Sequence, residues 1–359
     1  MTASLARYQG CLIGGAIGDA LGAPIEFLSL AQIQTQFGPA GVRDFAPAYG
    51  RRGAITDDTQ MSLFTAEGLL RAWARMHDRG LFSPVAVVGR AYLRWLYTQG
   101  HDAFENPRDK EGWLLELPEL HHRRAHGNTC LSALLSTPWG KPARNDSKGC
   151  GGVMRAAPAG LFIASTSKPE RWIEEAFELG CQIAALTHGH PTGQLTAGVL
   201  ASLVLQLVGG SRLRDALAVS MDFLADRPEC DETLSALKAA IELAERDADA
   251  DISLLGEGWI AEEALAMGVF AALTAADFGQ GVLRAVNHGG DSDSTGSIAG
   301  NLLGAALGME AIPTRWREEV ELGAAVLEIA NDLHACEGWG CADGHASLLG
   351  IIASRYPPS

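Results

Sequence analysis

The chain has 359 residues, 47% of them hydrophobic and 20% charged, and this globular composition excludes a disordered protein. Its 42 glycines follow no three-residue period, which excludes a collagen-like chain. The 28 Lys and Arg residues against 43 Asp and Glu residues give a formal net charge of −15, which argues against a nucleic-acid partner bound over a broad surface.

Hydrophobic residues recur at helical spacing through most of the chain, whereas the alternating pattern of strands is scarce. The periodic segments are 62–76, 171–186, 193–208, 213–224, 233–246, 261–275 and 317–334. No linker rich in Pro, Ser or Gly divides them, so we expect a single all-α domain over residues 1–359. Two long stretches, 100–128 and 137–152, lack this periodicity and are expected to be functional loops or disordered.

Targeting signals are not evident in the sequence. The apolar run near the N-terminus contains Asp19 and no clear cleavage pattern, so we do not expect a signal peptide. The most apolar window, 195–208, is too short to span a bilayer and predicts a buried helix. The seven cysteines are scattered without a C-x-x-C pair, which is typical of a reducing compartment. We therefore expect a cytoplasmic protein with no membrane partner.

Glycines recur at every fourth position in two segments, and each set forms a stripe along one face of a helix. The stripes are Gly10, Gly14, Gly18 and Gly22, and Gly296, Gly300, Gly304 and Gly308. Glycine inside a helix costs about 1 kcal/mol relative to alanine, so eight of them require a reason. We expect close backbone approach between helices at these stripes, with the two striped helices as candidate partners for each other.

Two acidic clusters lie at expected helix starts: Thr56-Asp57-Asp58-Thr59 and Asp291-Ser292-Asp293-Ser294-Thr295. Capping of free helix amides explains one Asp in each, or two. Four carboxylates that lie close together repel one another unless cations neutralise them. Hard oxygen ligands of this kind suit Mg²⁺ or Mn²⁺, so the two clusters together predict a metal site.

The second acidic cluster has features of two other motifs. An EF-hand loop beginning at Asp291 would need an acidic residue at 295 and Glu at 302, where this chain has Thr295 and Leu302, so we reject it. The pattern D-x-D-x-T also resembles the nucleophile motif of haloacid-dehalogenase-type phosphatases. That motif follows a buried strand, whereas here it lies late in a helical chain, and it remains a minor alternative.

Further candidates lie outside the acidic clusters. The turn 149–154 is rich in glycine and could hold a phosphate through its backbone amides, or be a plain loop. His188 and His190 lie at a helix end, as a cap or as a residue that faces a ligand. Glu26 could join the acidic site or lie on the surface. The alternating aspartates at 247, 249 and 251 are interpreted as a solvated loop.

In this order, the motifs resemble the ADP-ribosylglycohydrolase family, which includes dinitrogenase reductase-activating glycohydrolase and the ADP-ribosylarginine hydrolases. The matching pieces are G-x-x-x-G-D-A-L-G-x-P-x-E at 14–26, T-D-D-T-Q-M at 56–61, G-G-V-M-R at 151–155, T-H at 187–188 and G-G-D-S-D-S at 289–294. The resemblance covers about residues 8–307, and we expect helices within 308–359 to pack on that part.

The resemblance implies a compact all-helical fold with two divalent cations, Mg²⁺ or Mn²⁺, in a cleft. It implies metal ligands at Thr56, Asp57, Asp58, Asp291, Asp293 and Ser294. The family often has threonine where this chain has Ser294, so Thr295 is the alternative hydroxyl ligand. Substrate binding is implied for Gly149, Cys150, Gly151, Gly152, Val153, Met154 and His188. The mobile acidic residue of the family corresponds to Glu26.

The implied reaction is hydrolysis of the bond that joins ADP-ribose to a modified protein, with ADP-ribose as product. Activation of the attacking water is assigned to the metals with Asp57 or Asp58, and Glu26 is a candidate acid, base or gate. Arginine is the favoured linkage by analogy with the family, and serine and ester linkages are the alternatives. A binding module that holds ADP-ribose without turnover is a further alternative.

Overall fold

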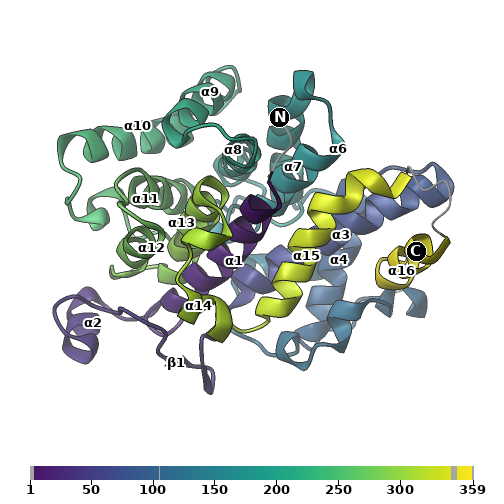
Figure 1. Cartoon of the computed structure of the whole chain (residues 1–359), viewed down its shortest axis with the longest axis horizontal. Helices are drawn as coiled ribbons and strands as arrows, with labels where there is room; N and C mark the ends of the chain where they lie inside the picture. The colour runs from purple at the N-terminus through teal and green to yellow at the C-terminus, as the bar shows by residue number, and fades with distance from the viewer. Residues whose placement is uncertain (1–3, 105, 341–345, 358–359) are drawn as a thin grey trace.

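The computed structural model describes residues 4–104, 106–340 and 346–357, and nearly all regular structure in this part is helical (Figure 1). The α-helices are α1 Leu5–Gly22, α2 Leu30–Phe37, α3 Asp57–Arg79, α4 Pro84–Thr98, α5 Asn128–Ser136, α6 Ala157–Thr166, α7 Trp172–Ala185, α8 Pro191–Val208, α9 Leu213–Ala225, α10 Asp231–Arg246, α11 Ala261–Leu273, α12 Phe278–Val286, α13 Ser292–Leu307, α14 Thr314–Glu319, α15 Gly323–Ala335 and α16 Ala346–Arg355. The expected all-α fold is confirmed.

Short elements connect these helices. Strands β1 Pro47–Ala48 and β2 Arg51–Arg52 form an antiparallel hairpin in which Pro47 pairs with Arg52. The 3₁₀ helices are η1 Pro107–Lys110, η2 Trp113–Glu116, η3 Pro118–Leu120, η4 Cys150–Gly152, η5 Pro169–Arg171, η6 Ile252–Leu255, η7 Met309–Ala311 and η8 Cys336–Gly340. The first three lie in the stretch 100–128, which explains why that stretch shows no α-helical periodicity.

Helices α1 and α13 lie side by side at the centre of the molecule, and α8, α11, α12 and α15 pack around them (Figure 1). They meet along the two glycine stripes. A Cβ atom added at Gly14 would lie 2.3 Å from the carbonyl oxygen of Gly300, and one added at Gly18 would lie 1.9 Å from that of Gly296. Since no real Cβ approaches an oxygen so closely, only glycine permits this contact. The predicted close approach is confirmed.

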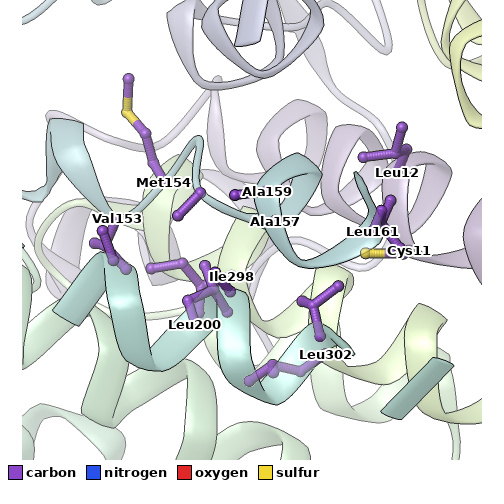
Figure 2. Close-up of a cluster of buried hydrophobic side chains, with 14 of the residues drawn as sticks. Cys11, Leu12, Val153, Met154, Ala157, Ala159, Leu161, Leu200, Ile298 and Leu302 are labelled. Carbon is purple, nitrogen blue, oxygen red and sulfur yellow. The ribbon is translucent and has the colours of Figure 1, made fainter. Parts of the chain in front are cut away.

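The hydrophobic core surrounds this helix pair. Figure 2 shows part of it, where Cys11 of α1, Leu161 of α6, Leu200 of α8 and Ile298 of α13 lie in one buried cluster. In the part of the chain that the structure describes, α8 is the helix long and apolar enough to match a membrane span, but 83% of it is buried within the protein. It is therefore the buried core helix that its sequence predicted.

Several helices differ from the sequence prediction. Residues 317–334 form two helices, α14 and α15, because Leu322 adopts a left-handed backbone with φ of 57° and the amide of Glu321 donates to the carbonyl oxygen of Gly53 at 2.9 Å. Helix α3 begins at Asp57, five residues earlier than expected, since its first turn is polar. Helices α2, α4, α5, α6 and α12 were not predicted.

Candidate metal centre

The first acidic cluster forms the N-terminus of α3. Thr56 is the N-cap residue, and its hydroxyl oxygen accepts a hydrogen bond from the amide of Asp58 at 3.4 Å. Asp57 and Asp58 follow in the first turn, and both side chains are buried. A helix N-terminus favours negative charge because its free amides point outward. The local sequence therefore places two carboxylates at a site where each is tolerated.

Asp19 of α1 fixes the position of this turn. Its carboxylate accepts hydrogen bonds from the amide and the hydroxyl of Thr56 and from the amide and the hydroxyl of Thr59, at 2.5–3.1 Å. A role of Asp19 at the site was not predicted from the sequence. The available signal was an acidic residue inside an otherwise apolar, glycine-striped helix, which is costly unless the residue has partners.

The second acidic cluster forms the N-terminus of α13, with Asp291 as the N-cap residue and Asp293 in the first turn. The hydroxyl oxygen of Thr295 lies 2.8 Å from the carbonyl oxygens of Ala285 and Asp291 and 2.9 Å from Nε2 of His288, so protein groups surround it. Ser294 instead borders the cavity described next. Of the two hydroxyl candidates, Ser294 is the one that faces the carboxylates.

A cavity of about 180 Å³ separates the two helix N-termini. Its acidic wall comprises Glu26, Asp57, Asp58, Asp291 and Asp293. Carboxylate oxygens of Glu26, Asp291 and Asp293 all lie within 4.8 Å of one another, and the three side chains are buried. Glu26 reaches this position because α1 ends at Gly22 and the following turns lead the chain back toward α13. The structure thus brings together the acidic residues that the sequence singled out.

Burial and mutual repulsion make these acids hard to ionise. Desolvation, with the charge of Asp293, raises the pKa of Asp57 to about 8 and that of Glu26 to about 11. The same causes raise the pKa of Asp58 and of Asp291 well above the usual range for aspartate. Such a cluster is costly as a set of free anions, and cations bound among the oxygens would remove the cost.

The donor set fits hard divalent cations. Oδ1 of Asp58 and Oε2 of Glu26 are buried and have no hydrogen-bond partner among the described residues. Buried carboxylate oxygens without partners are unusual in proteins, and they mark positions where a ligand is expected. All the acidic ligand atoms are oxygens, which Mg²⁺ and Mn²⁺ prefer. The hydroxyl of Thr56 donates its proton to Asp19, so a lone pair of this oxygen would remain to coordinate a metal.

The glycine-rich turn 149–154 lies beside the acidic wall. The amides of Val153 and Met154 donate to the carbonyl oxygen of Cys150, and the amide of Cys150 donates to that of Trp259. These amides are already used, so they are not free for a phosphate. Val153 packs into the hydrophobic cluster, where it does not border the cavity (Figure 2). Gly151 borders the cavity and is the better candidate for an anion-binding amide.

The remaining predicted residues occupy different positions. Gly149, Cys150, Met154 and His188 border the cavity, whereas Gly152 is buried behind it. The thiol of Cys150 donates a hydrogen bond to Oδ2 of Asp291 at 2.7 Å. His190, in contrast, caps the N-terminus of α8. The side chain of Asp249, in the acidic segment interpreted as a solvated loop, is 92% exposed and pairs with Arg284 at 3.0 Å.

Two exposed aromatic residues at the cavity were missed by the sequence analysis. The ring of Phe27, next to Glu26, stacks on the ring of Trp259 with centroids 6.1 Å apart and an angle of 19° between the planes. Trp259 borders the cavity, and Phe27 is 70% exposed. Large exposed aromatic residues next to an acidic candidate or within a glycine-rich turn, as in Gly256-Glu257-Gly258-Trp259, were the available signal.

Residues 1–341 match the sequence profile of the family described as ADP-ribosylglycohydrolase. The chain belongs to the ADP-ribosylglycohydrolase family. The resemblance inferred from five ordered motifs is therefore confirmed. Membership supports an activity that removes ADP-ribose, with dependence on metal ions, and the group of buried carboxylates in this chain is consistent with that dependence.

Named relatives span nearly the whole chain. The ADP-ribosyl-[dinitrogen reductase] glycohydrolase of Rhodospirillum rubrum is 25% identical over 88% of this chain and 90% of its own length. ADP-ribosylarginine hydrolase Tri1 of Pseudomonas putida strain GB-1 is 24% identical over 92% of this chain and 78% of its own. ADP-ribosylhydrolase ARH3 of Bos taurus is 23% identical over 92% and 93%.

A solved structure with the same fold is titled ADP-ribosylglycohydrolase-related protein complex. It superposes with a TM-score of 0.67 and 27% sequence identity, and the match covers 94% of this chain and all of that one. The likeness therefore extends over nearly the whole chain.

Proposed function

We propose that this protein is a metal-dependent hydrolase that cleaves the N-glycosidic bond between ADP-ribose and a modified arginine side chain of a protein. The observation that carries the proposal is the convergence of two buried acidic helix N-termini and Glu26 on one cavity, with carboxylate oxygens that lack partners within the described chain. Such a site suits a pair of divalent cations and a ligand rich in hydroxyl groups.

The metal ligands we propose come from both helix N-termini: Thr56, Asp57, Asp58, Asp291, Asp293 and Ser294. The carboxylates supply negative charge that Mg²⁺ or Mn²⁺ would balance, and the hydroxyls complete a set of oxygen donors. When bound, the cations would supply Lewis acidity toward ribose hydroxyls and lower the pKa of water. Asp19 would keep the first set of ligands in position through its bonds to Thr56 and Thr59.

Proton transfer is assigned to residues of the chain itself. Cleavage at the anomeric carbon leaves a nitrogen of the arginine guanidinium, which must gain a proton as the bond breaks. Glu26 borders the cavity, and its buried Oε2 has no partner among the described residues, so it is free to hold and deliver that proton. Asp57 and Asp58 are the candidates to accept a proton from the attacking water.

The anionic part of the substrate needs donors that an acidic protein can still offer. The amide of Gly151 and the imidazole of His188 border the cavity next to each other: a Cβ atom on Gly151 would lie 3.4 Å from Nε2 of His188. Neutral donors bind a diphosphate without adding a positive charge beside the metal ligands. We propose that they bind the diphosphate while the acidic wall receives the ribose.

The arginine linkage is proposed from the named relatives. Two relatives, from Pseudomonas putida strain GB-1 and Serratia proteamaculans strain 568, are named ADP-ribosylarginine hydrolases, at 24% and 25% identity to this chain. A partner that is an ADP-ribosylated protein follows from the same proposal. We also propose a cytoplasmic location, which is supported by free thiols at the six described cysteines, Cys11, Cys130, Cys150, Cys181, Cys230 and Cys336.

The experiment that tests the proposal measures ADP-ribose release from arginine-, serine- and acid-linked ADP-ribosyl peptides. It is run with Mg²⁺, with Mn²⁺, with EDTA and with the variant Asp291→Asn. We expect metal-dependent release from the arginine linkage, reduced at least about a thousandfold in the variant. Asp249→Asn, which changes an exposed aspartate of the same charge, is the matched control and should retain full activity.

Each alternative has its own outcome in this experiment. Release only from the serine or ester linkage would replace the proposed substrate but keep the hydrolase. Binding of ADP-ribose without release from any linkage would make the protein a binding module. Release that is unchanged by EDTA and by Asp291→Asn would contradict the proposed metal centre.

A further inference from the structure

Arg155 is a fully buried cation directly behind the cavity wall, and the proposed function gives it no task. No carboxylate lies within ion-pair distance of it among the described residues. Its guanidinium instead contacts Sδ of Met61 at 3.3 Å and Sγ of Cys130 at 3.2 Å, and lies 4.5 Å from the ring centroid of Tyr92. A buried charge held only by neutral groups is costly, so it calls for a reason.

The strongest polar contact of Arg155 leads to the cavity. Its Nη2 donates to the hydroxyl oxygen of Thr187 at 2.5 Å, and that oxygen lies 2.8 Å from Nδ1 of His188. Among the described residues, the hydrogen bond of the His188 ring is made at Nδ1, and His188 borders the cavity, which leaves Nε2 for a ligand. The three residues thus form a chain from a buried cation to a ring nitrogen that a ligand can reach.

The direction of these bonds follows from the donors available. Arg155 can only donate, so the oxygen of Thr187 accepts from it. The single hydroxyl proton of Thr187 has two acceptors within reach, Nδ1 of His188 at 2.8 Å and the carbonyl oxygen of Ala184 at 3.4 Å. The shorter contact is the better hydrogen bond, so the hydroxyl donates to Nδ1. The sulfur of Cys130 nearby is a weak acceptor.

Electrostatics favours the same direction. A hydroxyl that accepts from a cation becomes a stronger donor, because hydrogen bonds in a chain polarise one another. The opposite arrangement would point the N–H dipole of Nδ1 toward the guanidinium, whereas a lone pair on Nδ1 is attracted to it. Desolvation, together with the charge of Arg155, also lowers the pKa of His188 to about 3, so the ring is neutral and carries one proton.

We propose that Arg155 and Thr187 are positioning residues that hold His188 as the tautomer protonated at Nε2. Nε2 is then a hydrogen-bond donor toward the cavity, and it selects a ligand with an acceptor oxygen at this place. Together with the amide of Gly151, it forms a neutral pair of donors for one phosphate group. That this group is the diphosphate of ADP-ribose rests on the proposed function, whereas the tautomer itself does not.

The tautomer can be measured directly. Protein labelled with ¹⁵N-histidine, free of ligand and metal, is analysed by two-bond ¹H–¹⁵N correlation spectra, and the signal of His188 is assigned by its loss in His188→Gln. We expect Nε2 to carry the proton in the unmodified protein. Thr187→Val keeps the shape but removes the hydroxyl, and it should convert part of the population to the tautomer protonated at Nδ1. Thr187→Ser keeps the hydroxyl and should restore the original tautomer.

Ligand affinity supplies the second measurement, by calorimetric titration with ADP-ribose in the presence of Mg²⁺. We expect Thr187→Val to weaken the affinity about tenfold, the effect of one hydrogen bond, and Thr187→Ser to keep it. Thr196→Val is the matched control, because Thr196 is equally buried but its hydroxyl bonds only within α8. It should change neither the tautomer nor the affinity. Arg155 itself is left unchanged, since its loss from the core could unfold the protein.

The outcomes separate this inference from the proposed function. A proton on Nδ1 of His188 in the unmodified protein would overturn the inference, as would a Thr187→Val variant with unaltered tautomer and affinity. If the unmodified protein releases ADP-ribose from no linkage, the proposed hydrolase fails, but the tautomer measured without ligand still decides the role of Arg155 and Thr187.

Discussion

Single residues behind the cavity determine how its ligand atoms are presented, and Asp19 is the clearest case. Its two carboxylate oxygens accept hydrogen bonds from four donors, which are the amide and the hydroxyl of Thr56 and of Thr59. An asparagine at this position would face the same donors with an NH₂ group in place of one oxygen. The turn that presents Asp57 and Asp58 would then have to shift.

We therefore expect Asp19→Asn to weaken metal binding by about 10- to 100-fold without unfolding the protein. Binding of Mn²⁺ measured by electron paramagnetic resonance titration gives the affinity, and thermal melting in EDTA gives the stability. Asp249→Asn again serves as the matched control, since its side chain is exposed. Unaltered Mn²⁺ affinity in Asp19→Asn would show that the first cluster keeps its geometry without this residue.

The two neighbouring hydroxyls of the second cluster allow a sharper comparison. Ser294 borders the cavity, whereas the hydroxyl of Thr295 bonds the protein around Ala285, Asp291 and His288. Ser294→Ala should weaken Mn²⁺ binding about tenfold with little change in stability. Thr295→Val should destabilise the fold by about 1–3 kcal/mol, because it removes partners of buried groups, and leave the metal affinity nearly intact. A reversed pattern would identify Thr295 as the ligand.

At the scale of elements, the contact between α1 and α13 depends on the absence of side chains. A methyl group at Gly300 would lie 2.0 Å from the carbonyl oxygen of Gly14, which is backbone and cannot rotate away. We expect Gly300→Ala to lower the free energy of unfolding by about 3 kcal/mol or more. Denaturant titration followed by circular dichroism measures the change.

A glycine in a helix with open space around it is the control for this prediction. A Cβ atom at Gly350 of α16 meets nothing within 4 Å. The same substitution there should be neutral or stabilise the protein by up to about 1 kcal/mol, because alanine favours helices. Equal effects of Gly300→Ala and Gly350→Ala would mean that the helix pair tolerates a wider spacing.

The same element pair shows what sequence can predict. The four-residue glycine period is local information, and it was sufficient to predict both helices and their contact. The break between α14 and α15 was not predictable, because it depends on contacts with residues distant in sequence. Glu321 is buried, where it pairs with Arg124 and accepts from the amide of Ile55 at 3.1 Å. Those bonds, rather than any turn residue in 317–334, end the helix.

At the scale of the whole molecule, the acidic centre links stability to pH and metal. Burial, with neighbouring charges, raises the pKa of Asp57 to about 8 and that of Asp19 to about 7 in the folded protein without metal. The folded state binds these protons more tightly than the unfolded chain does. Their contribution to the free energy of unfolding is therefore fully present below the unfolded pKa of about 4. It is lost as the pH rises through 7 and 8.

The metal-free protein should accordingly become less stable between pH 6 and pH 8, by on the order of 2 kcal/mol for Asp57 alone. Mg²⁺ binds the ionised carboxylates, so its stabilising effect should be larger at pH 8 than at pH 6. Melting curves in EDTA and in Mg²⁺ at both pH values test this. A metal-free melting temperature that rises with pH over this range would contradict repulsion among the buried carboxylates.

The residues that line the cavity were largely predictable from the sequence, whereas the contacts that hold them in position were not. Paired acids at two helix starts, with Glu26 and His188 in ordered motifs, are patterns visible along the chain. Asp19 and Arg155 act through neighbours that only the fold brings together, so their roles could not be read from spacing. The glycine-rich turn shows the same limit, because the amide of Cys150 donates to Trp259, which is distant in sequence, while those of Val153 and Met154 donate back to Cys150.

The pairing of α1 with α13 also has a consequence for biosynthesis. Helix α1 emerges from the ribosome while α13, which begins some 270 residues later, has not been synthesised. The apolar, glycine-striped surface of α1 therefore lacks its partner helix during most of translation. Contacts of such long sequence separation slow folding and leave early segments open to aggregation. This surface of α1 is therefore a segment at risk of aggregation during synthesis, and the full set of proposed metal ligands comes together only after residue 294 has left the exit tunnel.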